Sequence, residues 1–158
     1  VRMDKKEIKI IKEITEKLLK LLDVDGDFEI LESTDKDGEN VEIVLNTKDT
    51  GVVIGYHGDT LEGLQLVLSL CVTRKLGRFV RVSIDVGDYK KNRIDWLKTL
   101  AQETKDRVLA DNTEIAIPDL KSWERRIVHL LLETDDKVMS ESQGEGRDRV
   151  LVVKAKSN

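Results

Sequence analysis

Two glycines separated by only two residues, Gly55 and Gly58, interrupt an apolar stretch and constrain the fold more than any other feature. Residues 52–54 before them are apolar, and an apolar helical pattern resumes after them. Glycine adopts the backbone angles of a sharp turn and has no Cβ to obstruct a close approach. The spacing therefore predicts a tight turn between two helices. Asp59 or Thr60 is expected to cap the second helix, whose free N–H groups and positive dipole end favour a phosphate.

The segments around this turn have the periodicities of helices and strands. Apolar residues recur every three or four positions in 4–22, which predicts an amphipathic helix with Ile8, Ile11, Ile14, Leu18 and Leu21 on its buried side. We expect, in order, a hairpin of strands at 28–32 and 41–45 with a turn at 35–40, a short helix at 50–54, a helix at 59–75 and a strand at 79–86. The helix at 59–75 is apolar on nearly every side, so we expect it, and Cys71 within it, to be buried.

The second half of the chain alternates helices with short strands. We expect an amphipathic helix at 88–109, a strand at 114–117 that ends at Pro118, a helix at 119–134, and strands at 137–141 and 147–153 joined by a glycine turn at 144–146. These strands are enough for a small three-stranded sheet.

Charge is distributed unevenly along the chain. The net charge of 158 residues is −4, but residues 23–62 hold twelve acidic and two basic groups, whereas residues 63–110 hold ten basic and five acidic groups. The positive charge thus lies directly downstream of the glycine turn, where an anionic ligand would need it. No run approaches the ~18 apolar residues of a membrane span, and no signal peptide is visible. We therefore expect a cytoplasmic protein without a membrane partner.

Arg125 and His129 form a second polar pattern, four residues apart on the helix predicted at 119–134. At ~100° of rotation per residue, both lie on one side of this helix. The opposite side carries Trp123, Ile127, Leu130 and Leu131. We expect this apolar stripe to face the core and the Arg–His pair to face a ligand.

Both patterns resemble known nucleic-acid-binding modules. The glycine turn with its flanking elements resembles the K-homology (KH) domain, whose Gly-x-x-Gly loop clamps the backbone of about four unpaired nucleotides. Arg125 and His129 match the signature of the R-three-H (Arg-x-x-x-His) domain, a small module that binds single-stranded nucleic acid. The pairing resembles the bacterial Jag family, also called KhpB or SpoIIIJ-associated proteins, from Lys5 to Lys156.

The resemblance implies an α+β protein of two domains. Residues 1–87 are expected to form a type II KH domain of α-β-β-α-α-β order, whose short first helix is Thr50–Ile54 and whose 35–40 loop borders the groove. Residues 88–158 are expected to form a small α/β R-three-H domain with a three-stranded sheet. Many family members carry a further N-terminal domain that this sequence does not include.

The resemblance also implies function and partners. Family members are non-catalytic RNA-binding proteins of the bacterial cytoplasm, and we expect a post-transcriptional regulator linked to cell elongation and division. Single-stranded RNA is the expected ligand, with single-stranded DNA as an alternative. Some members pair with a small KH protein, KhpA, and a homodimer is a further expectation.

Residues of both modules are expected to contact the RNA. In the KH domain these are Val53, Ile54, Gly55, Tyr56, His57, Gly58, Leu61, Arg78 and Arg81; beyond it they are Lys90, Lys91, Arg93, Arg125, Arg126 and His129. The family's loop usually carries basic residues where this chain has Tyr56 and His57. Because an ordinary imidazole is mostly neutral at pH 7, the loop should attract phosphate weakly, and Tyr56 is a candidate for stacking on a base or sugar.

Two other classes of function fit parts of the sequence. The acidic segment 23–62 and the weakly charged loop favour a protein-interaction scaffold whose KH surface mediates dimerisation. A phosphodiesterase would use His57 or His129 as general base. However, the sequence offers no paired carboxylates, metal-ligand cluster or nucleophile with a nearby histidine that could be assembled into a site. We therefore predict no catalytic residue, no metal and no cofactor.

Overall fold

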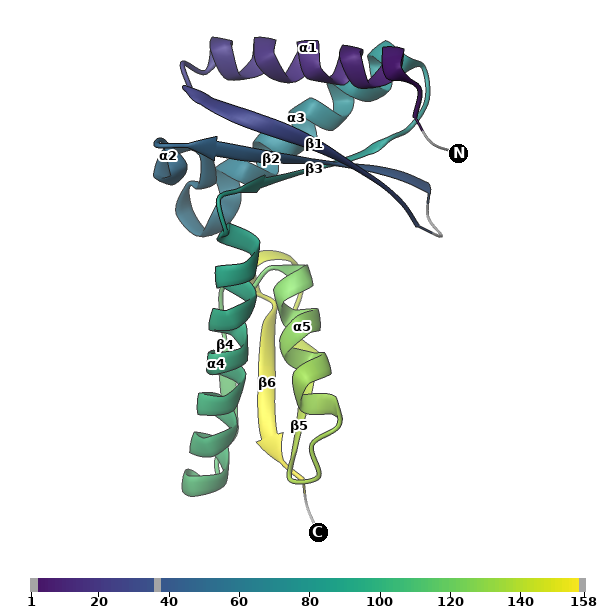
Figure 1. The fold of residues 1–158 in the computed structure, drawn as a ribbon. Coiled ribbons are helices and arrows are strands. Elements are labelled where there is room, and N and C mark those ends of the chain that lie inside the picture. The colour runs from purple at the N-terminus through teal and green to yellow at the C-terminus, as the bar shows by residue number, and fades with distance from the viewer. Residues whose placement is uncertain (1–2, 36–37, 157–158) are drawn as a thin grey trace. The chain divides into compact units, whose positions relative to one another are not determined.

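The computed structural model describes residues 3–35 and 38–156, and the chain divides into two compact units, 1–89 and 90–158. The first unit contains α1 (Lys5–Leu21), β1 (Gly26–Asp35), β2 (Gly38–Thr47), α2 (Thr50–Ile54), the 3₁₀ turn η1 (Tyr56–Gly58), α3 (Asp59–Leu76) and β3 (Arg81–Val86). Figure 1 labels its helices and strands. This is the α-β-β-α-α-β order of the type II KH fold. The short helix at 50–54 and the hairpin are confirmed, with longer strands than predicted. Part of the expected 35–40 loop, residues 36 and 37, lies outside the described residues.

Helix α1 is amphipathic and capped. The Asp4 side chain accepts the N–H groups of Lys6 and Glu7 at 2.7 and 2.8 Å, and the Glu7 carboxylate accepts the N–H of Asp4 at 3.1 Å. The residues that α1 buries are Ile11, Thr15 and Leu19. Leu21, which we expected on the buried side, is 82% exposed. Two residues correspond to about 200° of helix rotation, so Leu21 points away from the face that carries Leu19.

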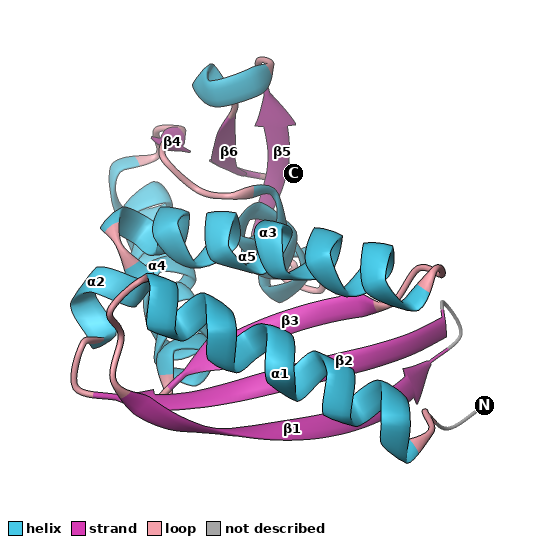
Figure 2. Ribbon diagram, turned by 90° about the horizontal axis from the view of Figure 1, so that it is seen from above, coloured by secondary structure: helices cyan, strands magenta, loops and turns pink. Residues whose placement is uncertain are grey.

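The sheet of the first unit has the order β1-β2-β3. β1 and β2 are antiparallel, with Gly26 opposite Thr47, and β2 and β3 are parallel, with Leu45 opposite Val86. Helices α1 and α3 lie on the same face of this sheet (Figure 2). The core lies between these helices and the sheet. Alternate residues of β2 and β3 contribute to it: Val41, Ile43, Leu45, Val82, Ile84 and Val86.

Helix α3 is buried on only one side. Leu61, Leu64, Leu68 and Val72 are buried, whereas Leu66, Val67 and Leu70 are 62%, 46% and 57% exposed. Cys71 is also exposed. The expectation that this helix and Cys71 are buried is therefore wrong. Because α3 packs against α1 and β3 from one direction, its remaining apolar side chains face outward.

The second unit contains α4 (Tyr89–Asp111, with Tyr89 still counted in the first unit), β4 (Ile115–Ile117), α5 (Ser122–Glu133), β5 (Val138–Gln143), the 3₁₀ turn η2 (Gly146–Asp148) and β6 (Val150–Ala155). The strands form an antiparallel sheet of order β4-β6-β5. Strand β4 ends before Pro118, as predicted. The two helices and the sheet pack around one core, whose residues include Leu97, Ala101, Val108, Val128, Leu132, Val138, Leu151 and Val153.

Helix α5 buries a different face from the one we expected. Glu124, Val128 and Leu132 are buried, whereas Trp123, Leu130 and Leu131 are exposed. The prediction that these three exposed residues face the core is wrong. Apolar residues cover a wide arc of α5, and the face that is buried carries Glu124 together with Val128 and Leu132.

No helix in the described parts of the chain combines the length and apolar character that crossing a lipid bilayer requires.

Candidate nucleic-acid interface

The glycine loop connects α2 directly to α3. The N–H of Gly55 donates to the carbonyl of Gly51 at 2.9 Å, which ends α2, and the N–H of Gly58 lies 3.4 Å from the carbonyl of Gly55. Gly55 has φ 70° and ψ −171°, a combination that is almost restricted to glycine, and Gly58 has φ 80° and ψ 12°. The loop is thus the sharp turn that the sequence predicted.

The space left by the missing glycine side chains is filled by the protein itself. A Cβ on Gly55 would lie 2.0 Å from Oγ1 of Thr60, and one on Gly58 would lie 2.7 Å from the hydroxyl oxygen of Tyr89. We expected the bare glycines to admit a ligand's backbone. That stays a prediction; both glycines have positive φ, and a Cβ at either position would meet side-chain atoms of the chain itself.

The two residues between the glycines are at the surface. Tyr56 is 77% exposed, and His57 is also exposed. Their rings are stacked, with centroids 4.1 Å apart and planes inclined by 27°. His57 has φ 50°, in the left-handed region that non-glycine residues rarely adopt. The outward surface of the loop is therefore aromatic.

The three apolar residues that we expected to contact the RNA differ in their burial. Val53 and Leu61 are buried in the core of the first unit, and Ile54 is half-buried. Of these three side chains, that of Ile54 has the most solvent-exposed area that a ligand could contact.

Arg78 and Arg81 lie at the opposite end of β3 from the loop. Tyr89, which meets Gly58, follows the C-terminal end of β3, whereas Arg81 begins this strand. Five residue steps of ~3.3 Å make a separation of about 17 Å along the strand. The structure does not place these two arginines beside the glycine loop.

Arg78 is held by two carboxylates. Its Nε and Nη2 donate to Oε1 of Glu7 at 3.1 and 2.9 Å, and its Nη1 donates to Glu39. The hydrogen bonds to Glu39 and then Glu7 raise the pKa of Arg78 above its usual value. The guanidinium thus connects the start of α1, the start of β2 and the segment before β3.

The cations at the start of α4 are not equivalent. Lys91 is exposed and Lys90 is half-buried. Arg93 is also half-buried; its Nε donates to Oε1 of Glu124 at 2.6 Å, and its Cζ lies 4.1 Å from the ring centroid of Trp96. The guanidinium of Arg93 therefore neutralises a buried carboxylate of α5.

The Arg-x-x-x-His pair is oriented by hydrogen bonds near the surface of the second unit. Arg125, half-buried, donates from Nη1 to the carbonyl of Leu120 at 2.5 Å and from Nη2 to Oγ of Ser122 at 3.1 Å. His129 is exposed, and its Nδ1 shares a 2.8 Å hydrogen bond with Oγ of Ser140 on β5. Neighbouring Arg126 is exposed.

Several residues that define these sites were missed by sequence reasoning. Tyr89 packs against Gly58, Ser140 orients His129, and Glu124 binds Arg93. Glu124 could have been found, because it stands four and eight residues before the buried Val128 and Leu132 and so shares their face of α5. Tyr89 and Ser140 carry no local signal. Asp59 or Thr60 was expected to cap α3, but Gly58 takes the cap position without a side-chain hydrogen bond, and Thr60 packs against Gly55.

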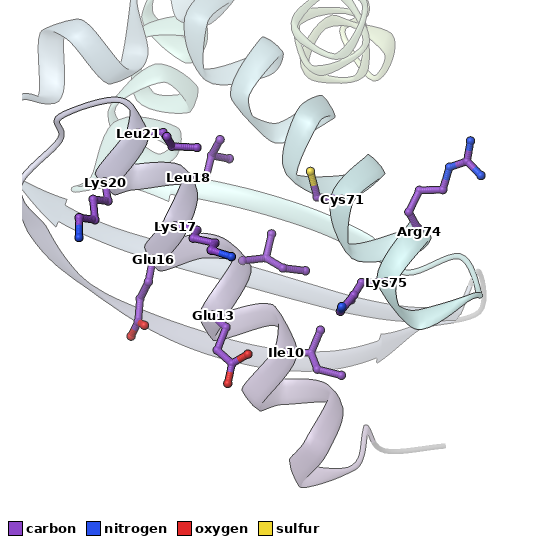
Figure 3. A pocket seen from close by; sticks show the side chains of 11 residues that line it. Ile10, Glu13, Glu16, Lys17, Leu18, Lys20, Leu21, Cys71, Arg74 and Lys75 are labelled. Atoms are coloured by element: carbon purple, nitrogen blue, oxygen red, sulfur yellow. The ribbon is translucent and has the colours of Figure 1, made fainter.

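A groove of about 850 Å³ lies between α1 and α3, away from these motifs (Figure 3). Its apolar lining consists of Ile10, Ile14, Leu18, Leu21 and Cys71, and its charged lining of Glu13, Glu16, Lys17, Lys20, Arg74 and Lys75. Within the described residues, no group of three or more His, Cys, Asp or Glu side chains is arranged to hold a metal ion.

Comparison with known proteins agrees with this domain order. Residues 9–84 match the family model for the KH domain of KhpA/KhpB, and residues 95–155 match that for the R-three-H domain. A protein of Streptococcus pneumoniae is 33% identical over 129 residues, which cover 82% of this chain and 39% of the relative. A protein of Clostridium symbiosum is 30% identical over 118 residues (75% and 53%), and one of Bacillus subtilis is 29% identical over 120 residues (75% and 58%). Each is named RNA-binding protein KhpB, and the chain spans about half the length of these relatives.

Proposed function

Because this chain belongs to the KhpB family, which joins a KH domain to an R-three-H domain, we propose that it binds single-stranded RNA without catalysing a reaction. The names of the curated relatives support the ligand class. KH domains bind unpaired nucleotides, and this supports a single-stranded ligand.

The observation that carries the proposal is that both motifs present polar or aromatic side chains at the surface. Tyr56 and His57 project from the rigid glycine loop, and His129 and Arg126 lie exposed on α5. Since the two units belong to one chain, binding at one raises the effective concentration of RNA at the other.

The predicted site residues take different roles in this proposal. Gly55 and Gly58 shape the loop, Val53 and Leu61 support it from the core, and Ile54 contacts a base. The exposed cations Arg81, Lys91 and Arg126 and the half-buried Lys90 neutralise phosphates, and Arg125 and His129 contribute on the same helix as Arg126. Arg78 and Arg93, whose charges are offset by carboxylates, mainly hold neighbouring elements in place.

A salt titration tests the proposal. Fluorescence anisotropy with an unstructured RNA should give an affinity that falls with salt at a log–log slope of about 0.7 per phosphate contacted. Single-stranded DNA of the same sequence should compete with the RNA for binding if the protein does not recognise the 2′-hydroxyl of the ribose. Absence of binding, or an affinity that does not respond to salt, would remove the electrostatic basis of the proposal.

In the cell, we propose that RNA binding serves post-transcriptional control in the bacterial cytoplasm, linked to cell elongation and division. The resemblance to the KhpB family supports this role. Crosslinking in cells followed by sequencing of the bound RNA tests it. Recovery of no transcripts above background would favour a scaffold function.

The exposed face of α3 supports a second function, protein pairing through the KH domain. Leu66, Val67 and Leu70 expose apolar surface that a second copy of this chain or a small KhpA-like protein would cover. Light scattering of the chain, alone and mixed with such a protein, tests this. Leu70→Glu should abolish pairing, whereas Leu31→Glu, at a similarly exposed leucine on β1, should not. Pairing should also protect Cys71, next to Leu70, from alkylation.

A further inference from the structure

The glycine loop has no positive side chain with which to hold a phosphate. Between Lys48 and Arg74 the sequence contains no lysine or arginine, whereas Asp59 and Glu62 lie in the first turn of α3. Their negative charges oppose the attraction that the positive end of a helix exerts on an anion. Clamping of a phosphate by this loop therefore has little electrostatic support.

The loop offers aromatic surface instead. The ring of Tyr56 is stacked on that of His57 at 4.1 Å between centroids, and Tyr56 is still 77% exposed. Since His57 covers one face of the tyrosine ring, this high exposure leaves the opposite face to solvent. A flat, open ring face is the surface on which a nucleobase stacks.

None of the other aromatic side chains is fully buried either, although Phe28 and Tyr89 pack against the core. All six aromatic residues lie in the described part of the chain, and none of them is among the buried core residues. Four are exposed: Tyr56, Phe79, Trp96 and Trp123. Leucine, isoleucine and valine fill the core, so Tyr56 is not required for packing.

The structure of the loop keeps the two rings in place. Gly55 packs against Thr60 and Gly58 against Tyr89, so neither end of the loop can shift without losing these contacts. His57 is held at φ 50°, a conformation that costs a non-glycine residue free energy and that persists only where the surroundings impose it. A ring that is already positioned loses little conformational freedom when a ligand binds.

We propose that Tyr56, backed by His57, is a stacking platform for one unpaired nucleobase, so that this loop recognises the face of a base. The inference rests on the proposed RNA binding and deepens it by naming the part of the RNA that the loop contacts. Because every base has a π face, such a platform favours unpaired strands over duplexes without selecting a sequence.

Binding of two RNA probes to the full chain tests this. One probe is a short oligoadenylate, and the other has the same length and backbone but lacks the central bases. Tyr56→Ala should weaken binding of the oligoadenylate by roughly 5- to 150-fold, the range of one base–aromatic stack, and leave binding of the abasic probe unchanged. Tyr56→Phe, which keeps the ring, should bind both probes like the natural chain.

Two further variants separate stacking from charge. Tyr56→Lys should strengthen binding of the abasic probe and raise the salt slope by about 0.7, without restoring the preference for bases. His57→Phe should keep the preference for the oligoadenylate over the abasic probe, because a ring still supports Tyr56. His57→Ala should reduce this preference. The quenching of a 2-aminopurine placed in the oligoadenylate reports the stack directly, and it should disappear in Tyr56→Ala.

The outcomes distinguish this inference from the proposed function. If the natural chain binds both probes equally, or if Tyr56→Ala weakens both equally or neither, the stacking platform is excluded while RNA binding stands. If the natural chain binds neither probe, RNA binding itself fails and the platform fails with it.

Discussion

Nε of Arg93 on α4 donates a 2.6 Å hydrogen bond to Oε1 of Glu124, which is completely buried on α5. The other oxygen of Glu124 accepts the N–H of Lys121 at 2.8 Å, and the guanidinium lies over the ring of Trp96. A buried carboxylate is tolerated only when its charge is paired and its lone pairs accept hydrogen bonds. This ion pair therefore links the two helices of the second unit.

Removal of Arg93 should destabilise the second unit. Arg93→Ala leaves the carboxylate of Glu124 buried and unpaired, which we expect to lower the free energy of unfolding by about 3 kcal/mol or more. Lys91→Ala, at an exposed position two residues away, is the matched control and should change little. Arg93→Met combined with Glu124→Leu should recover most of the loss, because no buried charge remains. Urea unfolding measures all of these variants; an Arg93→Ala chain as stable as the control would contradict the structural role.

The stability of the second unit should depend on pH through Asp135. Its Oδ2 pairs with Nζ of Lys105, and its Oδ1 accepts the N–H groups of Lys137 and Val138 at the start of β5. Chiefly because of Lys105, the pKa of Asp135 is lowered, and the same contact raises the pKa of Lys105. The stabilisation is therefore complete above the ordinary carboxyl value of about 3.9 and below the ordinary lysine value of about 10.4.

This stabilisation is lost as the pH falls through the lowered pKa of Asp135 or rises through the raised pKa of Lys105. Asp135→Asn keeps an oxygen for the two N–H groups but loses the charge. We expect it to be less stable than the natural chain at neutral pH, with a difference that shrinks in acid. Urea midpoints measured from neutral pH to about pH 3 give the difference, and Asp136→Asn serves as an exposed control. A difference that stays constant across this range would show that the charge of Asp135 does not matter.

The succession of elements could be predicted from the sequence because it depends on local patterns. The glycines at 55 and 58, the apolar period of α1 and the alternation in β3 each determine a short segment by themselves. Which side of a helix becomes buried depends on the neighbours that cover it. Leu21 follows the period of three and four but is exposed, because α1 buries the face marked by Ile11 and Leu19.

For the candidate site, the sequence predicted the positions of key residues but not the contacts around them. Spacing identified the positions of Tyr56 and His129, and the structure places both at the surface. Contacts around them come from distant parts of the chain: Tyr89 packs against Gly58 of the loop, and Ser140 binds His129. Such partners are brought together by the fold, and no local pattern in the sequence identifies them.

Two arginines should differ in their effect on the salt dependence of RNA binding. Arg126 is exposed on α5, so Arg126→Ala should lower the log–log salt slope by about 0.7. Arg78 is already paired with Glu7 and Glu39, so Arg78→Ala should leave the slope unchanged. Because Arg78 is partly exposed, its loss should reduce stability by no more than about 1 kcal/mol. Anisotropy titrations at several salt concentrations measure the slopes; equal reductions for both variants would mean that Arg78 contacts phosphate after all.

Substitutions of three glycines separate folding from ligand access. Gly55→Ala places a Cβ against Thr60 in a conformation almost restricted to glycine, and we expect a loss of stability of about 2 kcal/mol or more. Gly58→Ala meets the Tyr89 hydroxyl and should also destabilise. Gly63→Ala, on the exposed side of α3 with nothing within 4 Å, should stabilise by ~0.5–1 kcal/mol because alanine favours a helix.

The contact between Gly58 and Tyr89 gives a sharper version of this test. Tyr89→Phe removes the oxygen that lies 2.7 Å from the added Cβ, so Gly58→Ala should cost less stability in the Tyr89→Phe background than in the natural chain. Part of the cost should remain, since φ 80° still strains an alanine. If instead Gly58→Ala left the free energy of unfolding unchanged and lowered only the affinity for RNA, the glycine would be required for the approach of the ligand, and packing against Tyr89 would not explain it.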